Sequence, residues 1–360
     1  MVVPAAVADP GRPSGGNVYD RRVCDELAGL GWTVHEHLVP GDWPRPDDAA
    51  LAGLAATLAR LPDEACVLVD GLLASGADEV VVPAAGRLRL VVLLHMPLGA
   101  LDDDGALDHA GVRERRVLAA VSGVVVTSDW ARRRLAGLYG SVPGPVRVAA
   151  PGVDPGDLAE GSTPGGVLLC VAALVPQKGH DLLLGALAGV ADLSWRCICV
   201  GAVDLDKEHV AALRRQAEAS SIDERVHFAG VMGREELAGT FVGADLLVLP
   251  SRAETYGMVV TEALARGLPV LATDVGGVRE ALGEEGTGPA GILVEEGDEA
   301  ALADALRSWL EDPRLRDRLR GAARERRLTL SGWATTAHGV AAALMHEPDG
   351  NGLRVPRVGA

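Results

Sequence analysis

The sequence of 360 residues has little lysine, few aromatic side chains and an excess of acidic groups. Lys178 and Lys207 are the two lysines among 34 basic residues, against 50 acidic ones, so the formal net charge is −16. Because nucleic-acid backbones recruit basic surfaces, this balance argues against nucleic-acid binding as the main function. It still permits a local basic pocket for a small anion, and a lysine in such a background is more informative than usual.

Long apolar runs and a leader pattern are also missing. No stretch reaches the ~18 uninterrupted apolar residues of a membrane-spanning helix, and residues 1–10 show no basic segment followed by an apolar one. We expect free, buried thiols in a reducing, cytoplasmic compartment, because the cysteines are odd in number and form no CxxC pair. Peripheral contact with the inner membrane face through an amphipathic patch is compatible with this sequence. The five cysteines are Cys24, Cys66, Cys170, Cys197 and Cys199.

The motifs of several enzyme classes are absent. The chain has no GKS/T P-loop, no HExxH, no GxSxG and no GxGxxG. Asp102–Asp104 and the pair Asp204 and Asp206 resemble ligands for a divalent cation, but they stand in polar connections without supporting ligands, so we interpret them as solvated loops. Cys197 and Cys199 lie two apart on a predicted strand and also lack further ligands, which favours a place in the core. The sequence therefore predicts no metal site.

Strand-like apolar runs alternate with helical segments along the whole chain, with helices expected for example at residues 18–30, 49–61 and 130–138. Near-continuous β-branched runs are typical of strands that are buried on both faces of a parallel sheet. The alternation of strand and helix indicates a doubly wound α/β architecture. The predicted strands are residues 2–7, 34–38, 66–70, 90–94, 124–127 and 146–149, and then 167–172, 196–200, 226–229, 246–249, 270–272 and 291–294.

The strand pattern restarts once, after a segment that is rich in Pro, Gly and Asp at residues 151–166. That composition is typical of a linker. The chain is thus predicted to form two Rossmann-like, doubly wound domains, residues 1–157 and 158–330. Ligands of open α/β sheets bind beyond the carboxyl ends of the strands, so we expect the two sheets to face each other across a ligand-binding cleft.

The densest candidate site follows the predicted strand 246–249. A polar loop carries Glu254 and reaches Gly257, where a helix begins that carries Glu262. A helix start with free N–H groups favours an anion, and glycine lets a phosphate approach the backbone. A carboxylate beside such a site accepts hydrogen bonds from ribose or sugar hydroxyls. The alternative is an ordinary first-turn glutamate and a solvated loop charge.

Lys178 and Gly179 stand in the loop after the first strand of the second half, just before a helix. A lysine there offers a point charge for a phosphate, whereas a solvated surface lysine is the alternative. In the first half, Gly15 and Gly16 follow a strand and precede a helix, which suits an anion but is also typical of a plain turn. His95 closes a buried strand, as a pocket residue or as a satisfied core histidine.

Together these segments resemble a known family. The E-x7-E spacing of Glu254 and Glu262, the run ETYGMVVTEALARGLPVLATDVGGVREAL and the segment PQKGHDLLLGAL are similar to the carboxyl-terminal domain of retaining glycosyltransferases of family 4, which have the GT-B fold. The first-half segments SGGNVYDRRV, VLLHMPL, VVVTSDWARRRL and VRVAAPGVD are similar to that family in the same order, although more loosely. The resemblance also implies that a helix near residues 333–346 crosses back onto the first domain.

The resemblance implies a role for each candidate residue. Lys178, Glu254 and His95 would be the catalytic set: Lys178 would hold the nucleotide diphosphate, and Glu254 would contact hydroxyls of the transferred sugar. Glu262 would bind the ribose, and His95 would complete the donor site from the first domain. The remaining donor-binding residues would be Tyr256, Gly257, Met258, Val259, Gly15 and Gly16. One departure is Ala173, because many relatives have an arginine at that place as a second phosphate cation; Arg252 or Arg12 is a candidate substitute.

The resemblance implies a retaining transfer of a sugar from a nucleotide-diphosphate sugar to a hydroxyl acceptor, without a metal ion or another cofactor. The sequence identifies neither the base, the sugar, the acceptor nor the oligomeric state. A non-catalytic nucleotide-sugar or carbohydrate binder on the same fold is the main alternative, and Ala173 is the feature that favours it. A Rossmann-type oxidoreductase is a third possibility, against which the absence of GxGxxG counts.

Overall fold

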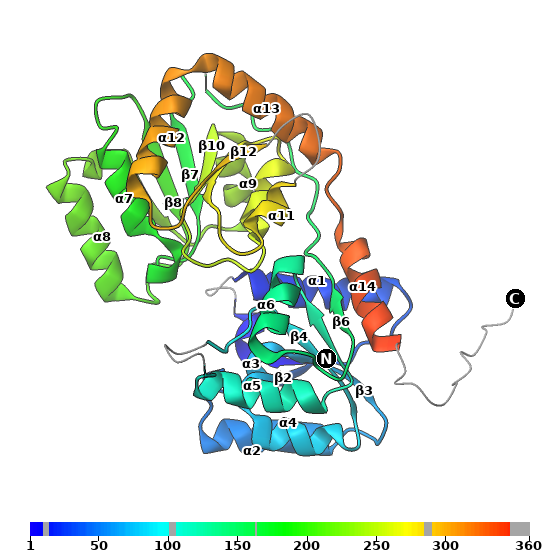
Figure 1. Cartoon of the computed structure of the whole chain (residues 1–360). Coiled ribbons are helices and arrows are strands. Elements are labelled where there is room, and N and C mark those ends of the chain that lie inside the picture. Colours follow the sequence, from blue (N-terminus) through cyan, green and yellow to red (C-terminus); the bar gives the residue numbers. More distant parts are fainter. Residues whose placement is uncertain (10–13, 101–105, 163, 284–289, 346–360) are drawn as a thin grey trace, which may run out of the picture.

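The computed structural model describes residues 1–9, 14–100, 106–162, 164–283 and 290–345, which form two α/β domains (Figure 1). Each domain contains a six-stranded sheet in which all neighbouring strands are parallel. The strand orders are β2-β1-β3-β4-β5-β6 and β12-β11-β10-β7-β8-β9. Two doubly wound, Rossmann-like domains are therefore confirmed as the fold class.

The strands agree closely with the apolar runs of the sequence. The first sheet consists of β1 (Val2–Pro4), β2 (His37–Val39), β3 (Cys66–Asp70), β4 (Arg89–Leu94), β5 (Gly123–Val126) and β6 (Val146–Val148). The second consists of β7 (Val167–Val171), β8 (Arg196–Val200), β9 (Val226–Gly230), β10 (Leu246–Leu249), β11 (Val270–Thr273) and β12 (Gly291–Val294).

Helices connect these strands and cover both faces of each sheet. In the first domain they are α1 (Gly15–Gly29), α2 (Asp48–Ala59), α3 (Gly71–Gly76), α4 (Asp78–Ala85), α5 (His109–Ala120) and α6 (Asp129–Tyr139). They continue with α7 (His180–Ala188), α8 (Lys207–Ala219), α9 (Arg234–Val242), α10 (Met258–Leu264), α11 (Val278–Leu282), α12 (Glu299–Glu311), α13 (Pro313–Arg327) and α14 (Trp333–Met345). No helix in these described ranges is long and apolar enough to cross a membrane.

Strand β4 shows why unbroken apolar runs form this fold. Leu90, Val92 and Leu94 pack into one apolar cluster, whereas Val91 and Leu93 pack into another, which includes residues of α1 and α14. Successive side chains of a strand point to opposite faces, so a strand that is buried on both faces needs apolar residues at every position. Each sheet is thus the middle layer of a three-layer sandwich.

The last described helix, α14, leaves the second domain and lies against the first (Figure 1). It packs on α1, with Val340 and Leu344 in the same apolar cluster as Tyr19. The rings of Tyr19 and Trp333 meet edge to face, with centroids 5.8 Å apart. The Tyr19 hydroxyl donates a hydrogen bond to the carbonyl of Ala149 at 2.8 Å, so α1 is held from two sides.

Three sequence interpretations need correction. The first strand ends at Pro4, because residues Ala5–Ala8 form a short 3-10 helix. The second strand runs from His37 to Val39 rather than over residues 34–38. Cys66 is exposed, since it is the first residue of β3, whereas the four other cysteines are buried free thiols.

Candidate functional site between the two domains

The loop that carries Lys178 packs directly on the loop that carries Glu254. Gly179 has a φ of +67°, and a Cβ there would lie 2.0 Å from the carbonyl oxygen of Pro250, so only glycine permits this approach. The backbone N–H of Arg252 donates to the carbonyl of Gln177 at 2.8 Å. These contacts fix the relative position of two loops that lie more than seventy residues apart in the sequence.

Lys178 and Glu254 form an ion pair in which Nζ lies 2.6 Å from Oε1. The same oxygen accepts a hydrogen bond from the hydroxyl of Ser251 at 2.8 Å. The side chains are 28% and 13% exposed, so both still reach solvent. The carboxylate therefore orients the amine, although it also takes up part of the charge that an anionic ligand would use.

Helix α10 begins directly after this loop. Gly257 precedes it with a φ of +88°, a conformation that strains any other residue, and no side chain of the described residues caps the helix. The side chains of Tyr256 and Val259 pack against the apolar cluster of the second domain, and burial raises the pKa of the Tyr256 hydroxyl. These residues can therefore contribute to a site mainly through backbone N–H groups of the first turn.

The start of α1 brings the two domains together. A Cβ at Gly15 would lie 3.3 Å from Sδ of Met258 in the second domain, and a Cβ at Gly16 would lie 3.3 Å from Cδ2 of His95. Ser14 caps this helix by accepting a hydrogen bond from the N–H of Asn17. Gly15 of the first domain thus lies beside the first residue of α10, and Gly16 lies beside His95.

A cavity of about 950 Å³ adjoins this meeting point. Met258 and Glu262 are the predicted site residues that line it, whereas Lys178, Glu254 and His95 do not. Side chains from α1, the interdomain linker and α9 complete the wall, among them Arg22, Asp154 and Leu237. The volume is typical of a small-molecule site, and Glu262 is the carboxylate of α10 that faces it.

Burial raises the pKa of Glu262 from its ordinary value to about 7; the charge of Arg266 lowers it only in part, and Asp154 raises it further. The pKa of this carboxyl is higher in the folded than in the unfolded protein. The protein is therefore more stable below pH 4.5, where the carboxyl is uncharged, than at alkaline pH, where it is charged. This contribution is lost as the pH rises through about 7.

Replacing this carboxyl removes that pH dependence. We expect Glu262→Gln to melt at a higher temperature than the wild type at pH 8, because the wild-type carboxyl is then ionised in its partly buried place on the cavity wall. At pH 5 the two proteins should melt alike. Thermal melts at both pH values test this, and an equal difference at pH 5 and pH 8 would contradict it.

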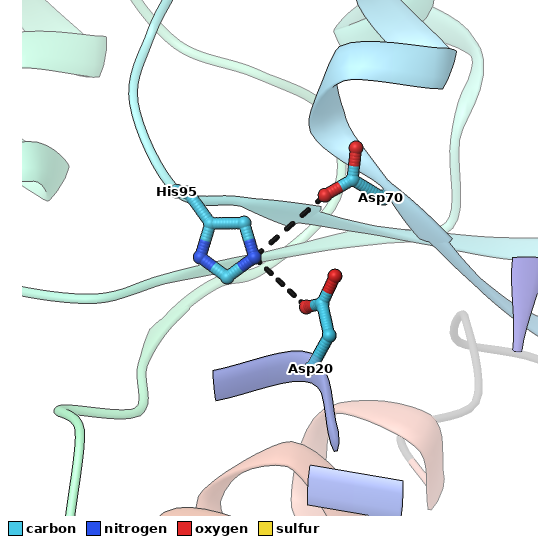
Figure 2. A group of neighbouring side chains, drawn as sticks. All are labelled: Asp20, Asp70 and His95. Carbon is cyan, nitrogen blue, oxygen red and sulfur yellow. Dashed lines mark hydrogen bonds and ion pairs between the residues drawn. The ribbon is translucent and has the colours of Figure 1, made fainter. Parts of the chain in front are cut away.

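A cluster that the sequence did not reveal surrounds His95 (Figure 2). Nε2 of His95 lies 2.8 Å from Oδ1 of Asp20 in α1 and 3.7 Å from Oδ2 of Asp70 at the end of β3. Both carboxylates are buried, with about 2% of each residue exposed. The three ligand atoms lie within 4.8 Å of one another, so this is the group in the described residues that could hold a metal ion.

Burial and the nearby charge of Asp20 raise the pKa of Asp70, against the opposing effect of His95 and backbone hydrogen bonds. Burial alone would lower the pKa of His95, but the charges of Asp20 and Asp70 and the hydrogen bond to Asp20 raise it overall. The chain that follows His95 is held by Glu114, whose carboxylate accepts hydrogen bonds from the N–H groups of Leu98 and Gly99.

The sequence also does not predict the hydrogen bonds that join the two domains near α6. The hydroxyl of Ser128 donates to the carbonyl of Thr255 at 2.7 Å, and the carboxylate of Glu280 accepts from the N–H groups of Asp129 and Trp130 at 2.8 and 2.6 Å. Glu280 therefore caps α6 from the other domain. A Gly-Gly pair after a strand precedes Glu280, a signal of the same kind as Gly15 and Gly16.

Arg252 and Arg12 are the candidate substitutes for a cation at position 173, and the structure describes only Arg252. Arg252 forms a bidentate ion pair with Asp181, at 2.9 and 2.6 Å, and also donates to the carbonyl of Pro176. Its charge is thus committed within its own domain. Arg12 and Asp102–Asp104 lie outside the described residues. Asp206 caps α8 by accepting from the N–H of His209, which accounts for one of the two loop aspartates.

The chain is similar to several known proteins. A family profile described as glycosyl transferases group 1 matches residues 161–326. The D-inositol 3-phosphate glycosyltransferase of Kineococcus radiotolerans is 33% identical over 66% of this chain and 60% of its own length. The D-inositol 3-phosphate glycosyltransferase 1 of Catenulispora acidiphila is 31% identical over 79% of this chain and 74% of its own length.

Solved structures match over more of the chain at lower identity, and they show the fold alone. A sucrose-phosphate synthase from Thermosynechococcus elongatus has a TM-score of 0.75 and 22% identity, over 95% of this chain and 97% of that one. Anabaena HepE, solved in complex with UDP and glucose, has a TM-score of 0.73 and 19% identity, over 95% of this chain and 98% of that one. The chain therefore belongs to the group 1 glycosyl transferases, the family-4 glycosyltransferases of GT-B fold that its sequence motifs resemble.

Proposed function

We propose that the protein transfers a sugar from a nucleotide-diphosphate sugar to a hydroxyl acceptor, with retention of anomeric configuration and without a metal ion. Two observations support the proposal: Lys178 pairs with Glu254 in the loops that precede α7 and α10, and Gly15 of the first domain lies beside Met258, the first residue of α10. Glu262 on the cavity wall is suited to the ribose hydroxyls. The roles of these residues follow the family resemblance.

The chemistry fits this arrangement. Breaking the bond between sugar and phosphate builds negative charge on the departing diphosphate, and fixed positive groups stabilise that charge as it grows. The amine of Lys178 and the amides at two helix starts are such groups. We assign no protein nucleophile, because the same-face attack that the family resemblance implies needs none. The acceptor would attack from the face that the diphosphate leaves, and the departing phosphate would take its proton.

The first experiment is a thermal-shift panel of nucleotide-diphosphate sugars, since a ligand that binds only the folded state raises its melting temperature. The nucleotide-diphosphate sugar that raises the melting temperature most is then incubated with hydroxyl acceptors. The first acceptor is inositol 3-phosphate, because the relatives are named for it. NMR of the product reads the anomeric configuration. Inversion would contradict the retaining mechanism, and binding without transfer or donor hydrolysis would favour the non-catalytic alternative.

Metal independence gives a separate prediction. We expect transfer to continue at an unchanged rate after treatment with EDTA, because the amine and the helix starts already neutralise the diphosphate. Initial rates with EDTA and with added Mg²⁺ or Mn²⁺ test this. A strict requirement for a divalent cation would contradict the proposal and direct attention to Asp20, Asp70 and His95.

A further inference from the structure

We propose that Glu280 and Ser128 are positioning residues. Together they clamp the start of helix α6, in the first domain, to the loop of Glu254, in the second domain, and they thereby set how the two halves of the site meet. The clamp itself is testable without any donor. Its effect on sugar transfer rests on the proposed function.

The second domain completes the start of α6. A helix leaves its first N–H groups without partners inside the helix. The carboxylate of Glu280 accepts from two of them with one oxygen each: Oε2 from the N–H of Asp129 at 2.8 Å and Oε1 from that of Trp130 at 2.6 Å. The helix dipole also favours a negative charge at this end. Figure 1 shows α6 and α11, the helix that carries Glu280, facing each other between the two domains.

Ser128 joins the same helix start to the loop of Glu254. Its hydroxyl accepts from the N–H of Ala131 at 3.0 Å and donates to the carbonyl of Thr255, the residue after Glu254, at 2.7 Å. Ser128 is completely buried, and Thr255 is buried as well. Because both residues are shielded from water, the loss of this hydrogen bond is costly.

In the second domain, Glu280 and the loop of Glu254 form one unit. The N–H of Gly277 donates to the carbonyl of Glu254 at 3.2 Å, and a Cβ at Gly277 would lie 2.3 Å from the carbonyl oxygen of Thr255. Helix α11 begins at the next residue and carries Glu280. A shift of Glu280 relative to α6 therefore moves Glu254 with it.

In the first domain, α6 follows strand β5, which lies beside the strand that leads to His95. Val126, the last residue of β5, pairs with Leu94, the residue before His95. The clamp thus connects the strand ends of the first domain with the residue that follows Glu254. Its hydrogen bonds run in both directions across the interface and need short distances and near-linear geometry, so they are satisfied together in one relative placement of the domains.

The first arm of the test measures the interface without a donor. Small-angle X-ray scattering of the full-length protein, well below its melting temperature, gives the radius of gyration of the wild type, Glu280→Gln and Ser128→Ala. Glutamine offers one acceptor and turns an NH₂ group toward the other N–H, whereas alanine removes the donor to Thr255. We expect a larger radius in both variants, because the domains part more often.

Arg133→Gln is the matched control. Arg133 is exposed and forms an ion pair with the same carboxylate at 3.3 Å, so its replacement changes a surface charge but none of the amide hydrogen bonds. The radius should then stay at the wild-type value. A merely structural role of Glu280 or Ser128 would lower the melting temperature and leave the radius unchanged. A radius equal to that of the wild type in either variant would therefore overturn the clamp.

The second arm measures kcat/KM for the nucleotide-diphosphate sugar that the thermal-shift panel selects. We expect each single variant to lose about tenfold and the double variant to be no slower than the slower single one, because the contact that remains is already lost when the domains part. Losses that multiply to about a hundredfold in the double variant would show two independent local effects and overturn the clamp.

The two arms separate this inference from the proposed function. A larger radius in both variants of a protein that transfers no sugar from any donor would retain the clamp and reject the function. Unchanged radii together with sugar transfer by the wild type would reject the clamp and retain the function.

Discussion

Lys178→Ala is expected to lower kcat/KM by about 10²- to 10³-fold while leaving the melting temperature within a few degrees of the wild type. The amine is one of the fixed positive groups at the departing diphosphate, and the loss of one such group costs about 3 kcal/mol of transition-state stabilisation. The loss should be larger in kcat than in KM, because negative charge grows as the bond breaks.

A second effect adds to the first. In Lys178→Ala the carboxylate of Glu254, which lies 2.6 Å from the amine in the wild type, loses its cation and repels the incoming diphosphate. The double variant Lys178→Ala, Glu254→Gln removes this repulsion, so we expect it to bind UDP-glucose more tightly than the single variant while staying as slow. Weaker binding by the double variant would show that Glu254 contributes attractive contacts to the donor independently of Lys178.

The chain supplies a matched control for this experiment. Lys207 is the other lysine, and it is exposed at the first residue of α8. Lys207→Ala removes the same charge from the same domain and should leave kcat/KM unchanged. Near-wild-type kinetics in Lys178→Ala, or equal losses in both variants, would remove Lys178 from the site.

Gly276→Ala is expected to destabilise the protein by about 3 kcal/mol and to abolish most activity. Gly276 has a φ of +60°, and a Cβ there would lie 1.5 Å from the carbonyl oxygen of Glu254. The left-handed conformation alone costs an alanine roughly 1–2 kcal/mol, and the clash must in addition displace the backbone that carries Glu254. Thermal melts should show a drop of roughly 6–12 °C.

Two control variants separate the cost of the left-handed conformation from the cost of the clash. Gly297 also has a positive φ, of +76°, but a Cβ there would meet no atom within 4 Å in the part of the chain that the structure describes. Gly297→Ala should therefore lose only the conformational part. Gly239, in α9, has open space, so Gly239→Ala should be neutral or slightly stabilising. A loss in Gly276→Ala no greater than that in Gly297→Ala would show that the Glu254 loop moves freely.

The fold could be predicted because its signals are local. The run Leu246–Leu249 is apolar at each of four successive positions and ends at Pro250, which indicates a doubly buried strand and its end without any knowledge of the neighbouring strands. The edge strand β2 was misplaced, since residues on an edge are less buried and their pattern is weaker: β2 contains one intermediate, one exposed and one buried residue.

The predicted site residues share another local signal, the end of a strand followed by a glycine and a helix. The sequence does not show which of these residues contact one another. Lys178 and Glu254 are 76 residues apart, and each looks like a separate ligand group until the fold brings them together. Asp20 looks like a solvated residue on an amphipathic helix, because its contact with the ring of His95 forms only in the fold. The role of Glu280 could not be predicted either, because it accepts hydrogen bonds at the start of α6, in the other domain.

The measurement that tests the central claim most directly is a crystal structure of the protein with a bound, intact nucleotide-diphosphate sugar. The account predicts the diphosphate between the domains, with Nζ of Lys178 and the amides of Met258 and Val259 on one side and the Gly15–Gly16 turn on the other. Glu262 would contact the ribose. A donor bound elsewhere, or a diphosphate from which Lys178 is turned away toward solvent, would contradict it.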